Sequence, residues 1–501
     1  MRELQLLSDL LASVGLSVPA GLEGVEVKAL RLDSRIVRPG DCFLALQGNK
    51  LDGRGFVEEA VKRGASAIVI ESDEDAELRQ SLGIPVVFQP ELRKHVGPLL
   101  DAWHGFPSRH LESVGITGTN GKSTTTILIT DILRAAKHKV ISLGTIRYEL
   151  EDEMLGSELT TPSPEIFFDL LDRGIQKGCD SLVMEVSSHA LSQDRIRGVK
   201  FKRAVFTNLT QDHFDFHSGF EDYFAAKKKL FTEYLAEDGM AVINLDTPYG
   251  VRLAGEWKGA RITFSRGETP EGNGADVVVG RQELSLSGTK LVVAYRDQEF
   301  EIRSQLIGSL NVENLLAAAA CGLSLGLSPK IVAKGIAGTM VPGRNEVFPL
   351  PGGRFAVVDY AHTPDALERV LQSLRPLTPG KLWCVFGCGG DRDRSKRPLM
   401  GGIAERLADR VVLTNDNPRT ENPVDILEGV RSGMVHPANA EVLEDRRSAI
   451  HHTLERMEPG DCLLVAGKGH ENYQIAGSTR RHFSDQEEIE EWKKSGVKSW
   501  S

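Results

Sequence analysis

Short apolar runs alternate with segments of helical periodicity in the first part of the chain. The runs cover Cys42–Leu46, Ala67–Ile70 and Val86–Phe88, and between them Phe56–Arg63 repeats its apolar positions at helical spacing. Apolar runs bounded by polar turns are typical of strands. Their alternation with helices predicts a small α/β domain over residues 1–110.

The alternation continues over residues 111–340, which we assign to a central domain. Apolar runs followed by helical stretches predict a parallel sheet wound on both faces. These runs are Val114–Thr117, Val140–Leu143, Ser181–Val186, Ala204–Thr207 and Ala241–Asn244. From Ala275 to Arg303 the spacing changes to period two around Ser287-Gly288, which predicts antiparallel hairpins. An alanine-rich helix from Asn314 to Leu325 closes the domain.

Residues 341–501 repeat the strand–helix pattern. The strongest runs are Phe355–Val358, Leu382–Phe386, Arg410–Leu413 and Cys462–Ala466, and each precedes a helical stretch. This third segment therefore predicts a second doubly wound sheet of the Rossmann-like type. Pro342-Gly343 is a turn signal, and we place the domain boundary and a hinge there. The predicted fold class is thus α/β with three domains.

The composition excludes several classes of protein. The chain has 501 residues, 41% of them hydrophobic and 26% charged, with a net charge of −10. No apolar run approaches the ~18 residues of a membrane span, and the negative charge argues against nucleic-acid or membrane binding. The N-terminus lacks the apolar core of a signal peptide, and the six scattered cysteines fit a reducing compartment. We therefore expect a cytoplasmic protein.

A glycine-rich turn follows the run that ends at Thr117. A turn of this kind between a strand and a helix cradles phosphate, because backbone N–H groups converge on the oxygens, a lysine adds a cation and a serine hydroxyl can bind Mg²⁺. The strict pattern has a glycine five residues before Gly121, where this chain has Ile116. The alternative is a glycine turn with an incidental lysine. The residues predicted to bind nucleotide here are Gly118, Thr119, Asn120, Gly121, Lys122, Ser123 and Thr124.

Polar residues follow several predicted strands, where ligands sit in open α/β sheets. They are Glu185, Asn208, Asp359 and Asp416. Glu185 is placed to hold Mg²⁺ against phosphates, or else it caps the next helix. His213 follows the next strand and is either a metal ligand or an ordinary satisfied histidine. Lys227 lies in a lysine run that by default is a solvated helix face, and it becomes a metal ligand only if it is modified.

The order of these motifs resembles one family. The motifs are GTNGKS at 118–123, EVSSH at 185–189, TNL at 207–209 with Asp212-His213, Asn311-x-x-Asn314 and DYAHTP at 359–364. Together they resemble the Mur ligases, ATP-dependent amino-acid ligases of peptidoglycan precursor synthesis. The resemblance spans the whole chain and is closest to the enzymes that add the third residue of the stem peptide. It implies ATP and two Mg²⁺ ions as cofactors, small-molecule substrates and a monomer.

The resemblance also implies site residues. Asn314, Arg344, Asp359 and His362 match ATP-binding positions, and Asn345 departs from the Met expected beside Arg344. Lys227 matches a carbamylated lysine, which with His213 would hold one Mg²⁺ while Ser123 and Glu185 hold the other. Lys122, Glu185, His213 and Lys227 form the implied catalytic group. The substrate is then UDP-N-acetylmuramoyl-L-alanyl-D-glutamate, which would meet Leu32, Ser34, Asn49, Lys50, Leu51, Thr160, Thr161, Ser187, Gln193 and Arg195.

The segment 416–419 bears on which amino acid is added. Its sequence DNPR is by itself a turn signal, but it resembles the form found in the ligases that add meso-diaminopimelate. A guanidinium at Arg419 would pair with the second carboxylate of that amino acid and repel the bare ammonium of lysine. Glu471 could receive the distal ammonium. The implied amino-acid site comprises Arg392, Asp416, Asn417, Pro418, Arg419, Gly467 and Glu471.

The implied reaction begins when the D-glutamate γ-carboxylate attacks the γ-phosphate of ATP. The resulting acyl phosphate is attacked by the neutral amine of the amino acid, and phosphate leaves. Competing interpretations are the same reaction with L-lysine, a D-alanyl-D-alanine-adding or folate-polyglutamate type of ligase, and a nucleotide switch without ligation.

Overall fold

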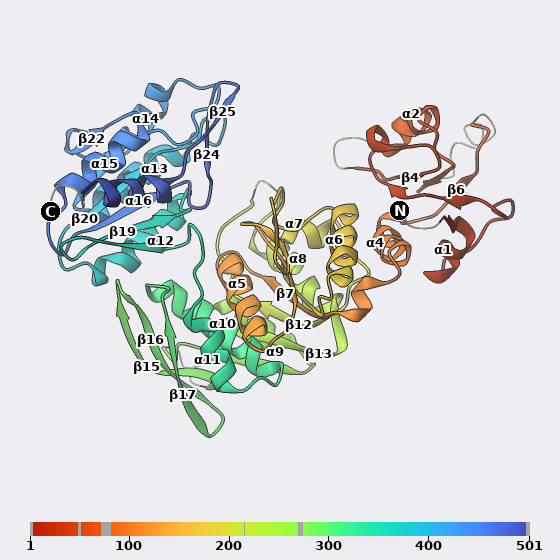
Figure 1. Cartoon of the computed structure of the whole chain (residues 1–501), viewed down its shortest axis with the longest axis horizontal. Helices are drawn as coiled ribbons and strands as arrows, with labels where there is room; N and C mark the ends of the chain where they lie inside the picture. The colour runs from red at the N-terminus through yellow and green to blue at the C-terminus, as the bar shows by residue number, and fades with distance from the viewer. Residues whose placement is uncertain (1–3, 49–51, 72–81, 215, 269–273, 497–501) are drawn as a thin grey trace. The chain divides into compact units, whose positions relative to one another are not determined.

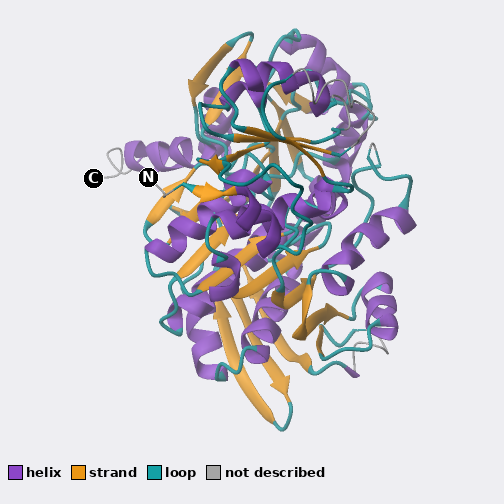
Figure 2. Cartoon of the chain, turned by 90° about the vertical axis from the view of Figure 1, so that its right-hand side faces the viewer, coloured by secondary structure: helices purple, strands orange, loops and turns teal. Residues whose placement is uncertain are grey.

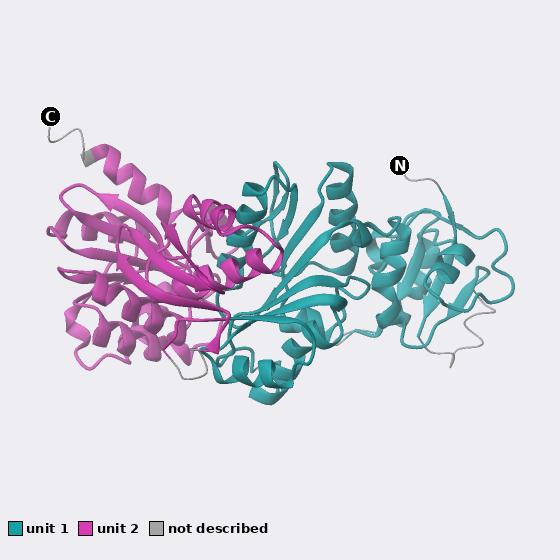
Figure 3. Cartoon of the chain, turned by 90° about the horizontal axis from the view of Figure 1, so that it is seen from below, with its two compact units in different colours: residues 1–263 teal, residues 264–501 magenta. Residues whose placement is uncertain are grey.

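The computed structural model describes residues 4–48, 52–71, 82–214, 216–268 and 274–496. The chain divides into two compact units, residues 1–263 and 264–501 (Figure 3). Each unit is described by itself. No helix in the described residues is long and apolar enough to cross a membrane.

A four-stranded parallel sheet organises the N-terminal segment (Figure 1). Its order is β3 (Leu30–Arg31), β4 (Cys42–Ala45), β5 (Ala67–Ile70) and β6 (Val86–Phe88). The predicted strands and helix are confirmed, because β4, β5, β6 and α2 lie where the apolar runs and the helical spacing placed them. The other elements are β1 (Gln5–Leu6), α1 (Leu7–Ser13), β2 (Glu26–Val27), α2 (Val57–Lys62) and α4 (Leu92–Trp103).

The central sheet has a parallel core, as predicted. Strands β8 (Val140–Leu143), β11 (Ser181–Glu185), β7 (Glu112–Thr117), β12 (Phe201–Phe206) and β13 (Leu235–Asn244) lie side by side in that order. An antiparallel hairpin of β9 (Tyr148–Leu150) and β10 (Glu153–Leu155) extends one edge. Period-two signals in such short strands are weak, and the sequence analysis did not predict this hairpin. The helices are α5 (Lys122–Ala135), α6 (Pro164–Gln176), α7 (Ser188–Ser192), α8 (Phe220–Thr232) and α9 (Pro248–Glu256).

Antiparallel strands open the second unit. Strand β15 (Val277–Ser285) pairs antiparallel with β16 (Gly288–Tyr295), and β16 pairs antiparallel with β17 (Gln298–Ser304). The last residues of β14 (Arg261–Ser265) pair in parallel with β15. The period-two prediction and its turn are therefore confirmed, and these strands are drawn in orange in Figure 2. Two helices follow, α10 (Ser309–Ser324) and α11 (Pro329–Ala337).

The C-terminal sheet has six strands and helices on both faces. Its order is β18 (Glu346–Leu350), β19 (Arg354–Asp359), β23 (Cys462–Ala466), β20 (Leu382–Phe386), β21 (Arg410–Leu413) and β22 (Ala440–Val442), and only β18 runs antiparallel to its neighbour. Apolar residues of α12 (Pro364–Leu374), α13 (Lys396–Leu407) and α14 (Pro423–Arg431) pack on one face. Those of α15 (Arg446–Arg456) and α16 (Asp485–Gly496) pack on the other.

Alternation along the strands explains this division. Val357 and Leu464 face the first helical layer, whereas Val358 and Val465 face the second. The doubly wound prediction is confirmed. One detail was wrong, because β23 is followed by a hairpin of β24 (Tyr473–Ala476) and β25 (Thr479–His482) before the next helix.

A buried ion pair joins the two helices of the second layer. Arg446 Nε and Nη2 each lie 2.7 Å from a carboxylate oxygen of Asp485, and both side chains are fully buried. Arg446 Nη2 also donates to Ala466 O at 3.0 Å, at the end of β23. The pair thus connects the starts of α15 and α16 to the strand that precedes the Gly467–Glu471 loop.

Asp485→Ala is expected to destabilise the protein by about 3–5 kcal/mol, because it leaves the Arg446 guanidinium buried without a counter-ion. Urea unfolding followed by circular dichroism measures the change. Asp365→Ala is the matched control, since Asp365 also lies in a first helical turn but pairs with Arg369 at the surface. Its cost should stay below about 1 kcal/mol. Equal costs for the two variants would contradict the role of the buried pair.

Candidate active site

The glycine-rich turn lies between β7 and α5, as predicted. Gly118 has a φ of 153° and Gly121 a φ of 84°, backbone conformations that favour glycine. A Cβ at Gly118 would lie 1.9 Å from Thr207 Oγ1, so no side chain fits between the loop and the end of β12. The turn leads directly into Lys122, the first residue of α5. The first N–H groups of such a helix lack intrahelical partners and suit phosphate oxygens.

Asn208, directly beyond β12, holds the loop in shape. Its backbone O accepts a hydrogen bond from Thr119 N at 2.9 Å, and its Oδ1 accepts one from Asn120 N at 2.9 Å. Lys122 Nζ donates to Gly118 O at 3.0 Å and to Thr119 O at 2.9 Å, so the ammonium lies over the loop. The sequence analysis identified Asn208 only as a polar residue at a strand end.

Glu185 ends β11 and lies opposite Ile116 of β7 in the parallel register. Its side chain is buried, and the two carboxylate oxygens accept hydrogen bonds from Thr145 N at 2.7 Å and Thr145 Oγ1 at 3.0 Å. The alternative that Glu185 caps the next helix is wrong. That helix, α7, is capped by Ser187, whose Oγ accepts from Ala190 N at 3.2 Å.

Thr145 is a site residue that the sequence analysis missed. It follows β8 after Gly144, where a Cβ would lie 2.4 Å from Glu185 Oε1. The sequence could have identified Thr145, because it follows another predicted parallel strand of the same sheet. Ser123 and Thr124, which follow Lys122 in the first turn of α5, are both buried.

Residues predicted to meet the muramoyl peptide form one hydrogen-bonded group around Glu185. Thr161 Oγ1 donates to Glu185 O at 2.9 Å and accepts from Ser187 N at 3.0 Å. Thr160 Oγ1 lies 3.0 Å from Thr145 Oγ1. The sequence separates these residues by up to 42 positions, and the sheet edge brings them together.

Gln193 and Arg195 extend the same group. Arg195 Nη1 donates to Thr161 O at 3.3 Å, and Arg195 Nε donates to Gln193 Oε1 at 2.9 Å. Burial lowers the pKa of Arg195 from its ordinary value, although a guanidinium stays protonated. All five described residues of the predicted muramoyl-peptide set therefore belong to one network.

Leu32 and Ser34 lie on the N-terminal segment of the same unit. Leu32 N donates to Glu165 Oε1 at 3.0 Å, and Ser34 Oγ donates to Glu59 Oε2 at 2.8 Å. Glu165 lies in the first turn of α6 and was missed by the sequence analysis, and burial raises its pKa. Asn49, Lys50 and Leu51 lie outside the described residues.

A cavity of about 1540 Å³ adjoins these segments. Leu30, Arg31 and Asp33 line it on the N-terminal side, and Leu159 and Pro162 line it on the central side. They are sequence neighbours of Leu32, Ser34, Thr160 and Thr161, so both predicted substrate segments border one space.

Lys227 lies on α8 and is only 1% exposed. Its Nζ donates to Gly118 O at 2.8 Å and lies 4.3 Å from the centre of the Tyr223 ring. Burial, together with the nearby Lys122 ammonium, lowers the pKa of Lys227 far below its ordinary value. The solvated-face interpretation is therefore wrong for Lys227, whereas Lys228 is half-exposed and pairs with Glu256 at 2.7 Å.

His213 also borders Tyr223, with ring centres 6.1 Å apart, and has a φ of 55°. Its ring lies 4.9 Å from that of His189, a residue that the sequence analysis did not assign to the site. Within the described ranges, no group of three or more His, Cys, Asp or Glu side chains is placed to hold a metal ion. A metal here would need other oxygen donors, such as the Ser123 hydroxyl or a modified Lys227.

Three of the predicted ATP residues, Arg344, Asp359 and His362, lie near Tyr360. Asp359 ends β19 and accepts from Asn345 N and Ala361 N, both at 2.8 Å, and burial raises its pKa. The Arg344 guanidinium lies 4.5 Å from the centre of the Tyr360 ring. Asn345 has a φ of 45°, a conformation that asparagine tolerates better than methionine, which explains the departure from the expected residue.

His362 belongs to this group, and the fourth predicted ATP residue, Asn314, lies on α10. His362 Nδ1 is 2.8 Å from Tyr360 O. Asn314 is buried on α10, where its Nδ2 donates to Asn311 Oδ1 at 3.0 Å.

The predicted amino-acid site has a buried lysine at its centre. Lys468 Nζ lies 3.4 Å from both Glu471 Oε2 and Asn417 Oδ1 and 4.0 Å from Asp416 Oδ1. Asn417 Nδ2 donates to Glu471 Oε2 at 3.0 Å. Gly467 has a φ of 114°, and a Cβ there would lie 2.5 Å from Asp416 Oδ2. Lys468 was missed, although its place directly after β23 was a signal.

Arg419 and Arg392 lie beside this group. Arg419 Nη1 donates to Gly390 O at 2.7 Å, and a Cβ at Gly389 would lie 3.0 Å from Arg419 Nη1 and 3.7 Å from Arg392 Cγ. Pro418 O accepts from Glu421 N at 3.1 Å. A turn therefore begins at Pro418, the third residue of the DNPR segment, and Arg419 also forms a β-bridge with Ala476. The segment carries side chains of the predicted amino-acid site.

Lys227→Met is expected to remove part of the pH dependence of stability. Between the lowered pKa of folded Lys227 and its ordinary value of 10.5, the unfolded chain binds more protons, so stability rises with pH by at most about 1.4 kcal/mol per unit. Urea unfolding in CO₂-free buffer from about pH 7 to about pH 9 measures this slope. The control Lys228→Met should keep the wild-type slope. Equal slopes in all three proteins would contradict the burial argument.

Three family models match the chain in order. They are the Mur ligase family catalytic domain at residues 26–117, the Mur ligase middle domain at 116–322 and the Mur ligase glutamate ligase domain at 343–469. A UDP-N-acetylmuramoyl-L-alanyl-D-glutamate–2,6-diaminopimelate ligase of Gloeobacter violaceus is 42% identical over 97% of both chains. Its namesake from Aquifex aeolicus is 41% identical over 93% of both chains.

A solved structure agrees with this similarity. A ligase of the same description is 31% identical, covers 98% of this chain and 100% of its own, and superimposes with a TM-score of 0.73. The family resemblance of the sequence motifs and the three-domain α/β architecture are thus confirmed. The chain belongs to the Mur ligase family.

Proposed function

We propose that the chain is an ATP-dependent ligase that joins meso-diaminopimelate to the D-glutamate γ-carboxylate of UDP-N-acetylmuramoyl-L-alanyl-D-glutamate. The observation that carries this proposal is the 42% identity over 97% of both chains with a ligase of that description. The DNPR segment and Glu471 support it, because they lie in one hydrogen-bonded group in the second unit.

The phosphate loop would bind the ATP phosphates. Backbone N–H groups of the loop and the start of α5 meet the oxygens, and Lys122, which already lies over the loop, adds a positive charge. Arg344, Asp359, His362 and Asn314 are the proposed ATP residues of the second unit. Arg344 would stack on or pair with parts of the nucleotide that a planar cation suits.

We assign two Mg²⁺ sites. Ser123 and Glu185 would hold one ion, and His213 and a carbamate on Lys227 would hold the other. The ions would neutralise the phosphate charge that develops during transfer. The place of Glu185 supports the first site, because it is a buried carboxylate at the sheet edge that carries the phosphate loop.

The environment of Lys227 favours carbamylation. Burial and the Lys122 charge stabilise the neutral amine, which is the form that attacks CO₂. The amine nitrogen bonds to the carbon and loses one proton, which gives an anionic carbamate. The carbamate supplies two oxygen donors, whereas a protonated lysine at this position would repel Mg²⁺.

The muramoyl-peptide precursor would span the two predicted segments of the first unit. Thr160, Thr161, Ser187, Gln193 and Arg195 are proposed to hold its peptide part. Leu32 and Ser34, with Asn49, Lys50 and Leu51, are proposed to meet its nucleotide. The cavity of about 1540 Å³ between those segments is large enough for part of this ligand.

The amino-acid substrate would bind in the second unit. Arg392 and Arg419 are proposed to pair with the distal carboxylate, which lysine lacks. Asp416, Asn417, Gly467 and Glu471 would surround the distal ammonium, in competition with Lys468. The other amine, held neutral, attacks the acyl phosphate, and the tetrahedral intermediate expels phosphate without a covalent enzyme intermediate. We place the enzyme in the cytoplasm as a monomer.

Phosphate release from ATP tests the proposal. Release is expected only with the UDP-linked dipeptide and meso-diaminopimelate together. Arg419→Ala should lower kcat/KM for meso-diaminopimelate on the order of 100-fold, because it removes a charged partner of the distal carboxylate. Arg410→Ala, at an exposed position at the start of β21, is the control and should behave as wild type.

Three results would overturn parts of the proposal. Phosphate release with L-lysine but not with meso-diaminopimelate would refute the role of Arg419. Absence of phosphate release with either amino acid would refute the assignment. Release that needs no amino acid would favour a nucleotide switch.

A further inference from the structure

The two loops that carry Arg392 and Arg419 are bonded to each other at several points. One loop follows β20 and spans 387–395, and the other follows β21 and spans 414–422. Gly390 N donates to Asn417 O at 2.9 Å, and Arg419 Nη1 donates to Gly390 O at 2.7 Å. A Cβ at Gly390 would lie 1.9 Å from Pro418 O, so the backbones approach at a distance that only glycine permits.

Both loops hold a non-glycine residue in the left-handed region. Asp391 has a φ of 53° and Arg419 a φ of 52°. Such conformations persist only where surrounding contacts impose them. Asp391 accepts from Thr420 N at 3.1 Å and from Thr420 Oγ1 at 2.8 Å, which accounts for part of that restraint.

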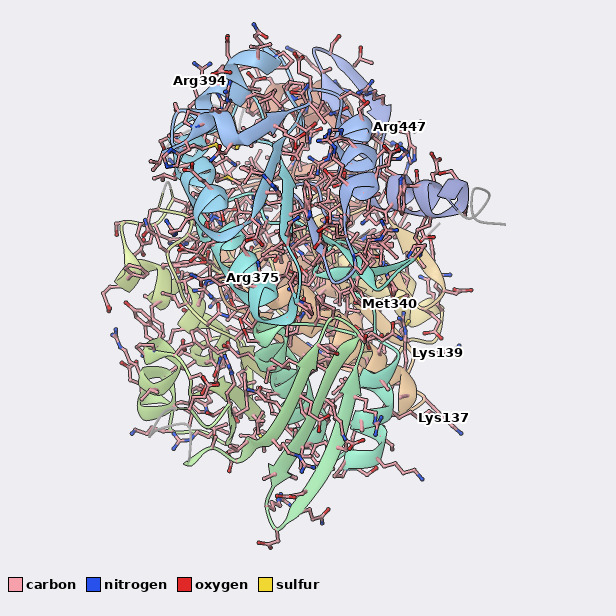
Figure 4. All side chains as sticks on the ribbon, turned by 90° about the vertical axis from the view of Figure 1, so that its left-hand side faces the viewer. Lys137, Lys139, Met340, Arg375, Arg394 and Arg447 are labelled. Carbon is pink, nitrogen blue, oxygen red and sulfur yellow. The ribbon has the colours of Figure 1, made fainter. Side chains whose placement is uncertain are left out.

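The β24 hairpin restrains Arg419, because Arg419 N donates to Ile475 O at 3.1 Å and Arg419 O accepts from Gly477 N at 2.6 Å. Glu421 restrains the first loop. Its Oε1 accepts from Asp391 N at 2.6 Å and from Arg397 Nη2 at 2.9 Å. Its Oε2 accepts from Arg397 Nη1 at 3.1 Å and forms an ion pair with Arg394 Nη2 at 3.0 Å. Arg394 lies on the loop that enters α13 and is labelled in Figure 4. One carboxylate therefore joins the second loop to the backbone of the first loop and to two arginines at its end.

The charges around Glu421 explain why an anion is needed there. Four guanidinium groups, those of Arg392, Arg394, Arg397 and Arg419, belong to these loops and to the start of α13. Glu421 pairs with Arg394 and Arg397. In the part of the chain that the structure describes, the Arg392 side chain makes no hydrogen bond or ion pair. The Arg397 guanidinium lowers the pKa of Glu421 to about 2, so the carboxylate stays charged at neutral pH.

We infer that Glu421 is a positioning residue for amino-acid selection. It neutralises Arg394 and Arg397 and fixes the two loops, so that Arg392 and Arg419 are presented to the second carboxylate of the substrate. This inference rests on the proposed function, because it specifies how the same site distinguishes diaminopimelate from lysine.

Glu421→Gln tests the inference. The amide keeps the shape of the side chain, but its NH₂ group must face an N–H donor, because both carboxylate oxygens accept hydrogen bonds from nitrogen. KM for meso-diaminopimelate should rise about 10-fold, which corresponds to about 1.4 kcal/mol. The values of kcat and of KM for ATP and the UDP-linked dipeptide should change less than about twofold.

A second variant, Arg397→Lys, distinguishes loss of loop positioning from misfolding of Glu421→Gln. Arg397→Lys keeps the charge but cannot donate from two nitrogens to Glu421, and it should raise the same KM selectively. Glu428→Gln is the control, since Glu428 pairs with Arg431 on the exposed side of α14. It should leave all constants unchanged.

The outcomes separate the inference from the proposed function. A selective rise in KM for meso-diaminopimelate in both variants supports the positioning role. An equal loss in every kinetic constant, or no change in either variant, overturns it while wild-type ligation stands. Absence of diaminopimelate-dependent turnover in the wild type instead overturns the proposed function.

Discussion

The parallel register of β11, β7 and β12 is the constraint on which the site in the first unit depends. Glu185 lies opposite Ile116, and Phe206 lies opposite Thr117, so the three strands leave the sheet at the same edge. Backbone hydrogen bonds set this register, and a slip of one residue would turn each side chain to the opposite face. The phosphate loop, the Glu185 carboxylate and the Asn208 anchor meet because these strands end together.

Buried lysines are the second shared feature of the sites. Lys227 and Lys468 are at most 1% exposed, and each lies beside residues proposed for substrates or metal. Buried charge is costly unless it is paired. The carboxylates of Asp416 and Glu471 compensate the charge of Lys468. Lys227 instead donates its hydrogen bond to the neutral carbonyl of Gly118. A neutral amine is therefore favoured at Lys227, which is the chemical condition for its proposed modification.

Much of the fold could be predicted from the sequence. Apolar runs located the main strands of all three domains, and period two located the hairpins after Ala275. Short edge elements such as β9, β10, β24 and β25 escaped prediction, since a few residues carry little periodicity. Within the sites, Thr145 and Glu165 were missed because their partners lie far away in sequence. Thr145 and Glu185, for example, are 40 positions apart.

The sequence by itself determined the class of fold, the phosphate loop and the family, because strand periodicity and ordered motifs are local or linear signals. Tertiary structure alone decided which lysine is buried. Lys227 and Lys228 are neighbours in one run, yet the rotation of α8 buries the first against Gly118 and leaves the second half-exposed beside Glu256. It also decided that Glu421 joins two loops, since loops that follow adjacent parallel strands meet only when the sheet has formed.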